Sequence, residues 1–301
     1  MDSSLENVSQ AQRERLAFLE FRAYFLGEVR RTDLIARFGI KTAAATRDIA
    51  LYKEIAKDNL IQDQKSKAYL PAETFVLQFE HSAERVLTAL TKGFGEGMGG
   101  GAKAPIPSEV PRLLNLPAIH LLAPITRAIH RKKAVKIVYS SFTSGENARE
   151  IAPFALANNG LRWHVRAYDR LKKGFRDFVL TRVSEPEFLD GSEVEEHEDP
   201  VNDLEWSRIV ELDLVPHPRL KSKDQAIVAM DYGMPSKDRV LKVRVRAALV
   251  GYFLRQWSVD CSEEHELSSE EIRLWLSNSR VLYAINNAVL APGYSKEQPV
   301  K

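Results

Sequence analysis

Anion-binding side chains alternate with apolar side chains in the segment 162–168, RWHVRAY. Successive side chains of a β-strand point to opposite faces. If this segment is a strand, one of its faces is apolar and the other is cationic and aromatic. The cationic and aromatic face consists of Arg162, His164, Arg166 and Tyr168.

A basic turn follows, and the segment 175–183 is predicted to return as a second strand that carries Arg176 and Arg182. Arginine forms bidentate hydrogen bonds with phosphate, and tyrosine and histidine can stack on a base. The hairpin therefore favours a recognition surface for an anion. The competing interpretation is a solvated strand face, which is what most charged runs are.

These residues also carry a family resemblance that covers about residues 119–189. Trp163-His164-Val165 stands where WYL domains have their Trp-Tyr-Leu signature, and the following FRDFVLTRV resembles their second motif. The upstream run AIHRKKAVKIVYSSFTSGENAREIAPFAL resembles the opening of the same domain. The segment departs from the signature in having His and Val in place of Tyr and Leu.

The resemblance implies a small SH3/Sm-like β-barrel over residues 118–195 that senses a ligand. It also implies that Arg149 lies on a strand adjoining the hairpin. Ser140 and Ser141 are interpreted as hydroxyls that bind an anion and not as nucleophiles. The predicted effector-binding residues are Ser140, Ser141, Arg149, His164, Arg166, Tyr168, Arg176 and Arg182.

A second candidate site lies in the segment 32–56, where a short helical pattern, a turn at Gly39 and a longer helical pattern follow one another. Helix, tight turn and helix is the helix-turn-helix pattern, although any small helical domain contains helix pairs. The second helix opens with small residues, which allow its N-terminal end to approach the major groove closely. The segment 59–70 is predicted to form a hairpin wing with lysines near its tip. The predicted DNA-binding residues are Lys41, Thr42, Ala43, Thr46, Arg47, Lys65 and Lys67.

The run FGIKTAAATRDIALYKEIAKDNL, with the YLPAETF after the wing, resembles winged helix-turn-helix regulators that carry WYL domains. The resemblance is to the BrxR/CapW type, which represses anti-phage defence operons. It implies a homodimer whose contacts lie in a small C-terminal α+β domain. There, Phe253, Leu254 and Trp257 are expected to be core residues.

The composition is that of a soluble globular protein, with 301 residues, 44% hydrophobic and 28% charged residues. A single cysteine and the lack of a signal pattern or a membrane-length apolar run predict a cytoplasmic protein. Charge is segregated: residues 127–182 hold thirteen Lys/Arg against four Asp/Glu, and residues 185–213 hold twelve Asp/Glu against one Arg. The acidic stretch is either a solvated linker or a shield for the basic face.

The predicted fold class is multidomain α+β. A winged helix-turn-helix domain with a following helix is expected over 1–92, and a Gly/Pro-rich linker over 93–117. The ligand-sensing WYL domain takes 118–195, and the C-terminal dimerisation domain takes 200–301.

Metal-ligand spacing and a Walker A run are missing, and the glycine run GFGEGMGGG has neither a predicted strand before it nor Lys-Ser/Thr after it, so neither an enzyme nor a cofactor is expected. The predicted function is a sequence-specific transcriptional regulator, a homodimeric repressor. Its expected partners are an operator duplex, a second copy and an anionic effector, either a nucleotide or a short nucleic acid, with no membrane. The alternative is an accessory module that binds single-stranded nucleic acid through its WYL face.

Overall fold

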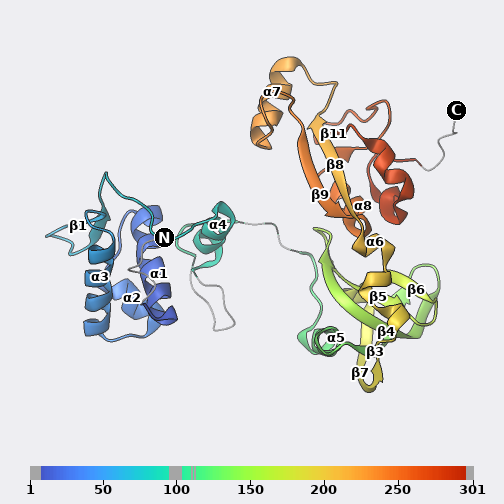
Figure 1. The fold of residues 1–301 in the computed structure, drawn as a ribbon, viewed down its shortest axis with the longest axis horizontal. Coiled ribbons are helices and arrows are strands. Elements are labelled where there is room, and N and C mark those ends of the chain that lie inside the picture. The colour runs from blue at the N-terminus through green and yellow to red at the C-terminus, as the bar shows by residue number, and fades with distance from the viewer. Residues whose placement is uncertain (1–7, 95–103, 110, 112, 296–301) are drawn as a thin grey trace. The chain divides into compact units, whose positions relative to one another are not determined.

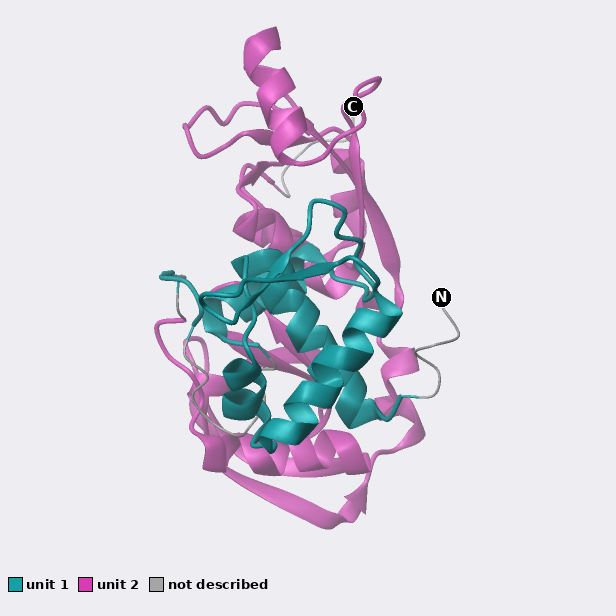
Figure 2. Ribbon diagram, turned by 90° about the vertical axis from the view of Figure 1, so that its left-hand side faces the viewer, with its two compact units in different colours: residues 1–111 teal, residues 112–301 magenta. Residues whose placement is uncertain are grey.

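The computed structural model describes residues 8–94, 104–109, 111 and 113–295 (Figure 1). The chain forms two compact units, residues 1–111 and 112–301 (Figure 2). Their boundary falls within the segment predicted as a Gly/Pro-rich linker. Residues 95–103, 110 and 112 of that segment lie outside the described residues.

The first unit is a helical domain with a short β-hairpin. The side chain of Ser9 caps α1 by accepting a hydrogen bond from the amide of Gln12 (3.3 Å). Gly27 and Gly39 end α1 and α2 in the left-handed conformation, with φ of 77° and 63°, which glycine adopts without steric cost. The elements are α1 (Gln10–Leu26), α2 (Arg31–Phe38), α3 (Thr42–Ile55), β1 (Leu60–Gln62), β2 (Tyr69–Pro71) and α4 (Ala83–Lys92). This arrangement confirms the predicted winged helix-turn-helix.

The second unit begins with α5 (Ile119–Arg131) and a five-stranded antiparallel sheet in the order β6-β5-β4-β3-β7. One face of this sheet packs against α5 around Ile125, Val165 and Phe178. The edge strands β6 and β7 do not pair with each other, so the sheet is open. This corrects the closed SH3/Sm-like barrel that the family resemblance implied. The strands are β3 (Lys133–Ser141), β4 (Gly145–Asn158), β5 (Trp163–Asp169), β6 (Gly174–Val179) and β7 (Val183–Glu193).

The predicted alternation along β5 is observed. Val165 and Ala167 are buried on the α5 side, and His164 and Arg166 lie on the opposite side. The predicted returning strand 175–183 is shorter than expected, because β6 ends at Val179 and a 3-10 turn follows at Leu180–Arg182. That turn takes the chain from one edge of the sheet to the other, where β7 pairs with β3.

The C-terminal part of this unit has its own core and a four-stranded sheet in the order β10-β11-β8-β9. Leu254 of α8 is fully buried in this core, and Phe253 and Trp257 pack against it, in agreement with the sequence prediction. The elements are α6 (Leu204–Ser207), β8 (Ile209–Pro216), α7 (Ser222–Asp231), β9 (Leu241–Arg246), α8 (Val250–Gln256), β10 (Val259–Asp260) and β11 (Leu274–Leu276).

None of the described helices is at once long and apolar enough to cross a membrane. No group of three or more His, Cys, Asp or Glu side chains in the described ranges could hold a metal ion. The chain's one cysteine, Cys261, is buried, and burial raises the pKa of its thiol.

Candidate nucleic-acid interface and effector pocket

The first turns of α3 present the predicted DNA-binding residues on one exposed surface. Ala45, Ile49 and Tyr52 bury the opposite side of the helix against the domain core. The hydroxyl of Thr46 donates a hydrogen bond to the carbonyl of Thr42 (3.0 Å). The exposed residues are Lys41, Thr42, Ala43, Thr46 and Arg47. They form a small, mostly uncharged surface with a cation at either end.

The wing presents Lys65 and Lys67 on the turn between β1 and β2, where both are exposed. Asp63 organises this turn, because its carboxylate accepts hydrogen bonds from the hydroxyl and amide of Ser66 (2.5 and 2.9 Å). These hydrogen bonds hold the pKa of Asp63 below its usual value. The wing tip is therefore a defined loop that carries two cations.

A buried carboxylate, Glu20, fixes α3 to the rest of the domain. It accepts a hydrogen bond from the hydroxyl of Tyr52 (2.7 Å) and from the amides of Gln78 and Phe79 (2.8 and 3.0 Å). Nε2 of His81 lies 2.9 Å from the same carboxylate. Burial and then the charge of Glu20 raise the pKa of Tyr52. One side chain of α1 thus ties α3 to the segment that leads into α4.

In the second unit, Arg166 of β5 is held by carboxylates on two sides. Its guanidinium donates to both oxygens of Asp203 (2.7 and 3.0 Å) and to Asp177 of β6 (3.1 Å). The hydroxyl of Tyr252 on α8 donates to the other oxygen of Asp177 (2.9 Å). Burial opposes the charge of Arg166, but the hydrogen bonds to Asp203 and the charge of Asp177 outweigh it and raise the pKa of Arg166. This network joins the sheet to the C-terminal part of the unit.

Other arginines of the sheet are also paired with carboxylates. Arg149 forms a buried ion pair with Asp169, and Arg176 lies 3.6 Å from the same carboxylate. Arg170 donates two hydrogen bonds to Glu198 (2.6 and 2.8 Å). Glu198 and Asp203 both belong to the acidic stretch 185–213. That stretch therefore contacts the basic domain directly, through Arg166 and Arg170.

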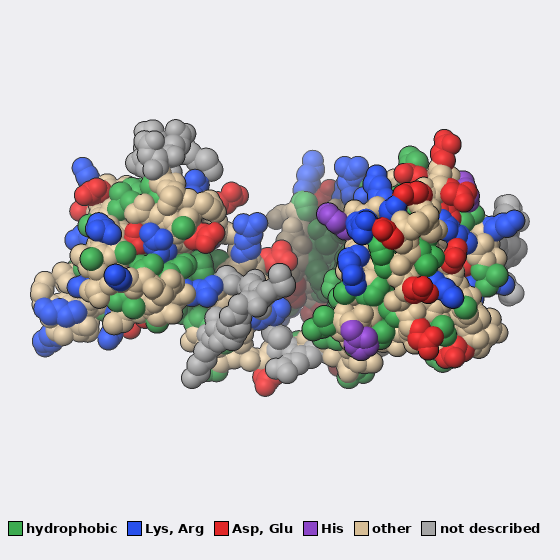
Figure 3. Space-filling model, turned by 90° about the horizontal axis from the view of Figure 1, so that it is seen from below, with side chains coloured by type: hydrophobic (Ala, Val, Ile, Leu, Met, Phe, Trp, Pro, Cys, Tyr) green, Lys and Arg blue, Asp and Glu red, His purple; other side chains and the backbone are tan. Residues whose placement is uncertain are grey.

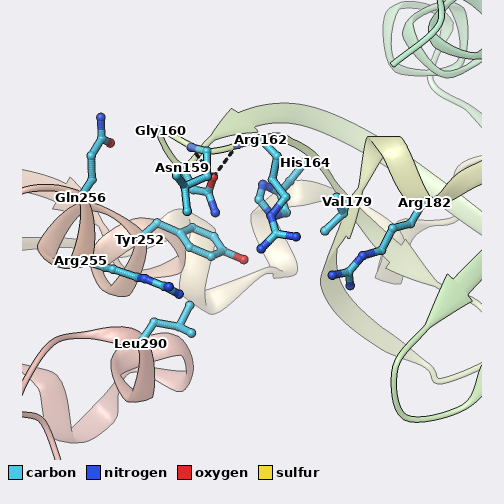
Figure 4. Close-up of a pocket in the computed structure, with 11 residues that line it drawn as sticks. Asn159, Gly160, Arg162, His164, Val179, Arg182, Tyr252, Arg255, Gln256 and Leu290 are labelled. Carbon is cyan, nitrogen blue, oxygen red and sulfur yellow. Dashed lines mark hydrogen bonds between the residues drawn. The ribbon is translucent and has the colours of Figure 1, made fainter. Parts of the chain in front are cut away.

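Three arginines remain around a pocket of about 490 Å³ between β5 and α8. Arg162 from the loop before β5, Arg182 from the 3-10 turn and Arg255 from α8 turn their guanidinium groups toward one space (Figure 4). None of the three pairs with an acidic side chain in the described part of the chain, and no acidic residue lines the pocket. On the face of residues 112–301 seen in Figure 3, several Lys and Arg side chains lie along one edge, and others are interspersed with Asp and Glu side chains. The pocket is thus suited to an anion.

Aromatic groups accompany these cations. The ring of His164 stacks on the ring of Tyr252, with centroids 5.1 Å apart and planes inclined by 25°. Burial lowers the pKa of His164, and its Nδ1 has no hydrogen-bond partner among the described residues. The guanidinium of Arg182 lies 4.3 Å over the ring of Phe142, which is 91% exposed. The site therefore offers cations for a phosphate and flat groups for stacking.

The structure brings together only some of the predicted effector-binding residues. His164 and Arg182 line the pocket, whereas Arg149, Arg166 and Arg176 form the ion pairs described above and lie outside it. The reason for Arg176 is register: it lies opposite Ala167 and so shares the side of the sheet that packs against α5.

The three other predicted residues also lie apart from the pocket. Tyr168 packs against the rings of Phe175 and His197. Ser140 and Ser141 lie at the end of the β3–β4 hairpin, where their hydroxyls bond to Glu146 and Thr143. Arg255 and Arg162 are absent from the predicted effector-binding residues, although Arg162 is placed on the cationic face of the predicted strand. The alternation that singled out His164 also points to Arg162, but no local signal could point to Arg255.

Comparison with known proteins shows the family. A DNA-binding transcriptional repressor, CapW from Pseudomonas aeruginosa, is 31% identical over 274 residues, covering 89% of this chain and 89% of that protein. The chain belongs to the CapW family. Repressors of the same name from Escherichia coli (strain KTE188) and Stenotrophomonas maltophilia are 28% identical over 281 residues and 27% identical over 296 residues. They cover 91% and 92% of this chain, and 91% and 96% of their own lengths.

Three family models match successive parts of this CapW-family chain. The BrxR transcriptional regulator winged helix-turn-helix domain matches residues 11–92, the WYL domain 120–188, and the BrxR transcriptional regulator C-terminal dimerization domain 209–282. They confirm the WYL and BrxR/CapW resemblance. Among solved structures, the proteasome accessory factor B/C of Arthrobacter aurescens is 20% identical over 81% of this chain and 44% of that chain. Its TM-score is 0.27, which supports no inference for a CapW-family protein.

Replacement of Asp203 by alanine should lower the free energy of unfolding by about 3–5 kcal/mol, because it leaves the buried Arg166 charge under-compensated. Arg166→Met should also be costly, and the double variant should lose less than the sum of the two single variants. Urea unfolding of the full chain, followed by near-ultraviolet circular dichroism, measures these values. The exposed pair Arg131–Asp190 is the control, and Asp190→Ala should cost at most about 1 kcal/mol. Additive effects at Arg166 and Asp203 would contradict the coupling.

The lowered pKa of His164 predicts a pH dependence of stability. The ordinary pKa of a histidine is about 6.5, and the pKa of His164 in the folded chain is lower. Between these two pKa values the unfolded chain protonates the imidazole while the folded chain keeps it neutral, so the free energy of unfolding falls as the pH is lowered from the higher pKa to the lower one. His164→Gln should flatten this part of the curve, measured as urea midpoints between pH 8 and pH 5. His130→Gln, at an exposed position, controls for the loss of an imidazole elsewhere. A curve for His164→Gln as steep as that of the wild type would reject this origin.

Proposed function

We propose that the chain is a homodimeric transcriptional repressor that binds operator DNA through α3 and the wing. The observation that carries this proposal is the exposed surface of Lys41, Thr42, Ala43, Thr46 and Arg47 on the first turns of α3. A recognition helix reads base edges with its N-terminal residues, and small side chains allow close approach. Membership of the CapW family and the matched dimerization domain support the repressor and the dimer.

The effector in this proposal is an anion, a nucleotide or a short nucleic acid, bound among Arg162, Arg182 and Arg255. Three guanidinium groups without acidic neighbours around one pocket bind phosphate oxygens by charge-assisted hydrogen bonds. The ring of His164 is 4% exposed and stacked on Tyr252, so the ring that offers a surface for a base is the exposed Phe142 beside Arg182. This assignment keeps His164 and Arg182 from the predicted set and adds Arg162 and Arg255.

Binding at this pocket is suited to regulation because its two sides belong to different parts of the second unit. His164 of β5 and Arg162 directly before that strand lie within the part matched by the WYL model, and Arg255 lies on α8 within the matched dimerization domain. An anion that draws the three arginines together favours one arrangement of the two parts. It changes operator affinity only by the ratio of its affinities for the two arrangements. An anti-phage defence operon is the proposed target, on the basis of the resemblance to BrxR/CapW regulators.

Arg47→Ala should weaken binding to DNA from the protein's own promoter by about 1–3 kcal/mol and reduce the preference over random duplex, because it removes a base contact. Lys41→Ala should weaken both duplexes alike and lower the salt slope by about one unit, because it removes a phosphate contact. Gel-shift titrations at several salt concentrations measure both effects. Lys53→Ala, in the last turn of the same helix, is the control and should bind as the wild type does.

The result that contradicts this reading of α3 is operator binding by Arg47→Ala equal to that of the wild type. Equal affinity of the wild type for promoter and random duplex would instead favour the accessory single-strand-binding module.

Arg255→Ala and Arg182→Ala should abolish the response to effector and leave operator affinity within about twofold, because neither residue lies in the winged helix. A reporter driven by the protein's own promoter, with and without phage challenge, measures the response. Arg219→Ala, an exposed arginine away from the pocket, is the matched control. Normal induction in both pocket variants would reject the pocket as the sensor.

A further inference from the structure

A second cavity of about 380 Å³ lies beside the arginine pocket. The two cavities share Gly160, Leu161 and Arg162, and Thr181 lines the second cavity where its neighbour Arg182 lines the first. The lining of the second cavity is Leu113, Leu114, Asn115, Gly160, Leu161, Arg162 and Thr181. One loop and one 3-10 turn therefore border both spaces.

The two cavities differ in chemistry. Three leucines line the second cavity and Arg162 is its one charged residue, whereas three arginines line the first. Leu161 is 57% exposed and Leu114 is fully exposed, so apolar surface faces water at this site. The side chains of Asn115 and Thr181 add hydrogen-bonding groups. An isolated anion would bind weakly in this cavity, but burial of an apolar or planar group there is favourable because it removes apolar surface from water.

The loop between the cavities is held in a defined conformation. The side chain of Asn159 accepts hydrogen bonds from the amides of Leu161 and Arg162 (3.0 and 2.9 Å), and that of Asn158 accepts one from Gly160 (2.7 Å). Gly160 has φ of 83°, and a Cβ there would lie 2.7 Å from the side chain of Gln256. These hydrogen bonds thus hold the backbone of Leu161 and Arg162 in place between the two cavities.

We propose that the second cavity is a subsite for the ring of an anionic effector whose phosphates lie among the three arginines. The proposal rests on the effector pocket proposed above and specifies its ligand class. The ligand is a phosphate ester that carries a planar ring, as a nucleotide does, and not a bare anion. The arginine pocket binds the phosphate groups of this ligand, and the leucine-lined cavity beside it binds the uncharged ring.

This subsite also gives the ligand a route to regulation. Residues 113–115 belong to the segment that leads from the first unit into the second. A ring in the second cavity contacts these residues directly, whereas a bare anion in the arginine pocket does not reach them. The ring-bearing ligand therefore acts on the connection to the winged helix domain.

The test uses calorimetry to measure the affinity of the full-length protein for two probes. Both probes carry a diphosphate group, but only adenosine 5′-diphosphate has a ring, and inorganic pyrophosphate has none. Leu161→Ser should weaken binding of the adenosine probe about five- to tenfold and leave pyrophosphate binding unchanged, because Leu161 borders both cavities but its side chain offers apolar contact to a ring and no hydrogen bond to phosphate. Leu171→Ser is the matched control, since Leu171 is 58% exposed and Leu161 is 57% exposed. Arg255→Ala should weaken both probes.

A second readout locates the ring. Cys261 is 2% exposed, so the thiol introduced by Leu114→Cys is the one that an alkylating reagent reaches first. The adenosine probe should slow this alkylation at least about fivefold when bound at saturation, pyrophosphate should not, and the thiol introduced by Leu171→Cys should react at one rate throughout.

Two results overturn the subsite: equal affinity of the wild type for the two probes, or equal weakening of both probes by Leu161→Ser. Loss of pyrophosphate binding in Arg255→Ala would still support the arginine pocket in either case. Failure of the wild type to bind either probe rejects the pocket and the subsite together.

Discussion

The bidentate ion pair between Arg166 and Asp203 is the contact on which the arrangement of the second unit depends. Both charges are buried, and a buried charge is tolerated only where a partner compensates for the lost hydration. Asp203 lies directly before α6, so the pair fixes the point where the chain leaves the sheet for the C-terminal core. Asp177 extends the network to Tyr252 of α8. The pocket between β5 and α8 exists because these contacts hold its two sides.

The same pairing determines which cations remain for a ligand. Glu198, Asp203 and Asp169 engage the arginines around them, and Arg162, Arg182 and Arg255 are left without an acidic partner among the residues that the structure describes. The first unit follows the same rule. Arg15 is paired with the buried Asp48 of α3, while Arg47, next to Asp48 in sequence, is exposed. In both units internal carboxylates hold the framework, and the proposed sites use cations without such partners.

Local patterns in the sequence were sufficient to predict most of the elements, and the residues predicted to bind DNA lie together on the exposed side of α3. Gly39 and the small residues after it identified the helix-turn-helix, and the alternation in 162–168 identified β5 and its two faces. Charge counts indicated a basic domain followed in the sequence by an acidic stretch. The pairing itself depends on how the chain returns after β7, and such long-range contacts leave no periodic signal. The prediction therefore could not separate Arg166, which is paired, from Arg162, which is not.

Two further features depended on tertiary structure. The 3-10 turn at Leu180–Arg182 interrupts a run that reads as one strand, and it leaves Arg182 beside the pocket instead of among the ion pairs of β6. Arg255 lies far along the chain, on a helix whose position follows from the Arg166 network and the C-terminal core. The barrel implied by family resemblance is an open sheet, because closure requires pairing of β6 with β7, which is not observed.

The central claim is that the arginine pocket and the winged helix are thermodynamically linked. The most direct test measures the affinity for promoter DNA with and without saturating adenosine 5′-diphosphate, and the affinity for that nucleotide with and without saturating promoter DNA. Linkage requires both affinities to change by the same factor, and we predict a factor of about 5 to 150, which disappears in Arg255→Ala. Tight binding of nucleotide and DNA to the wild type, with neither affecting the other, would contradict the account.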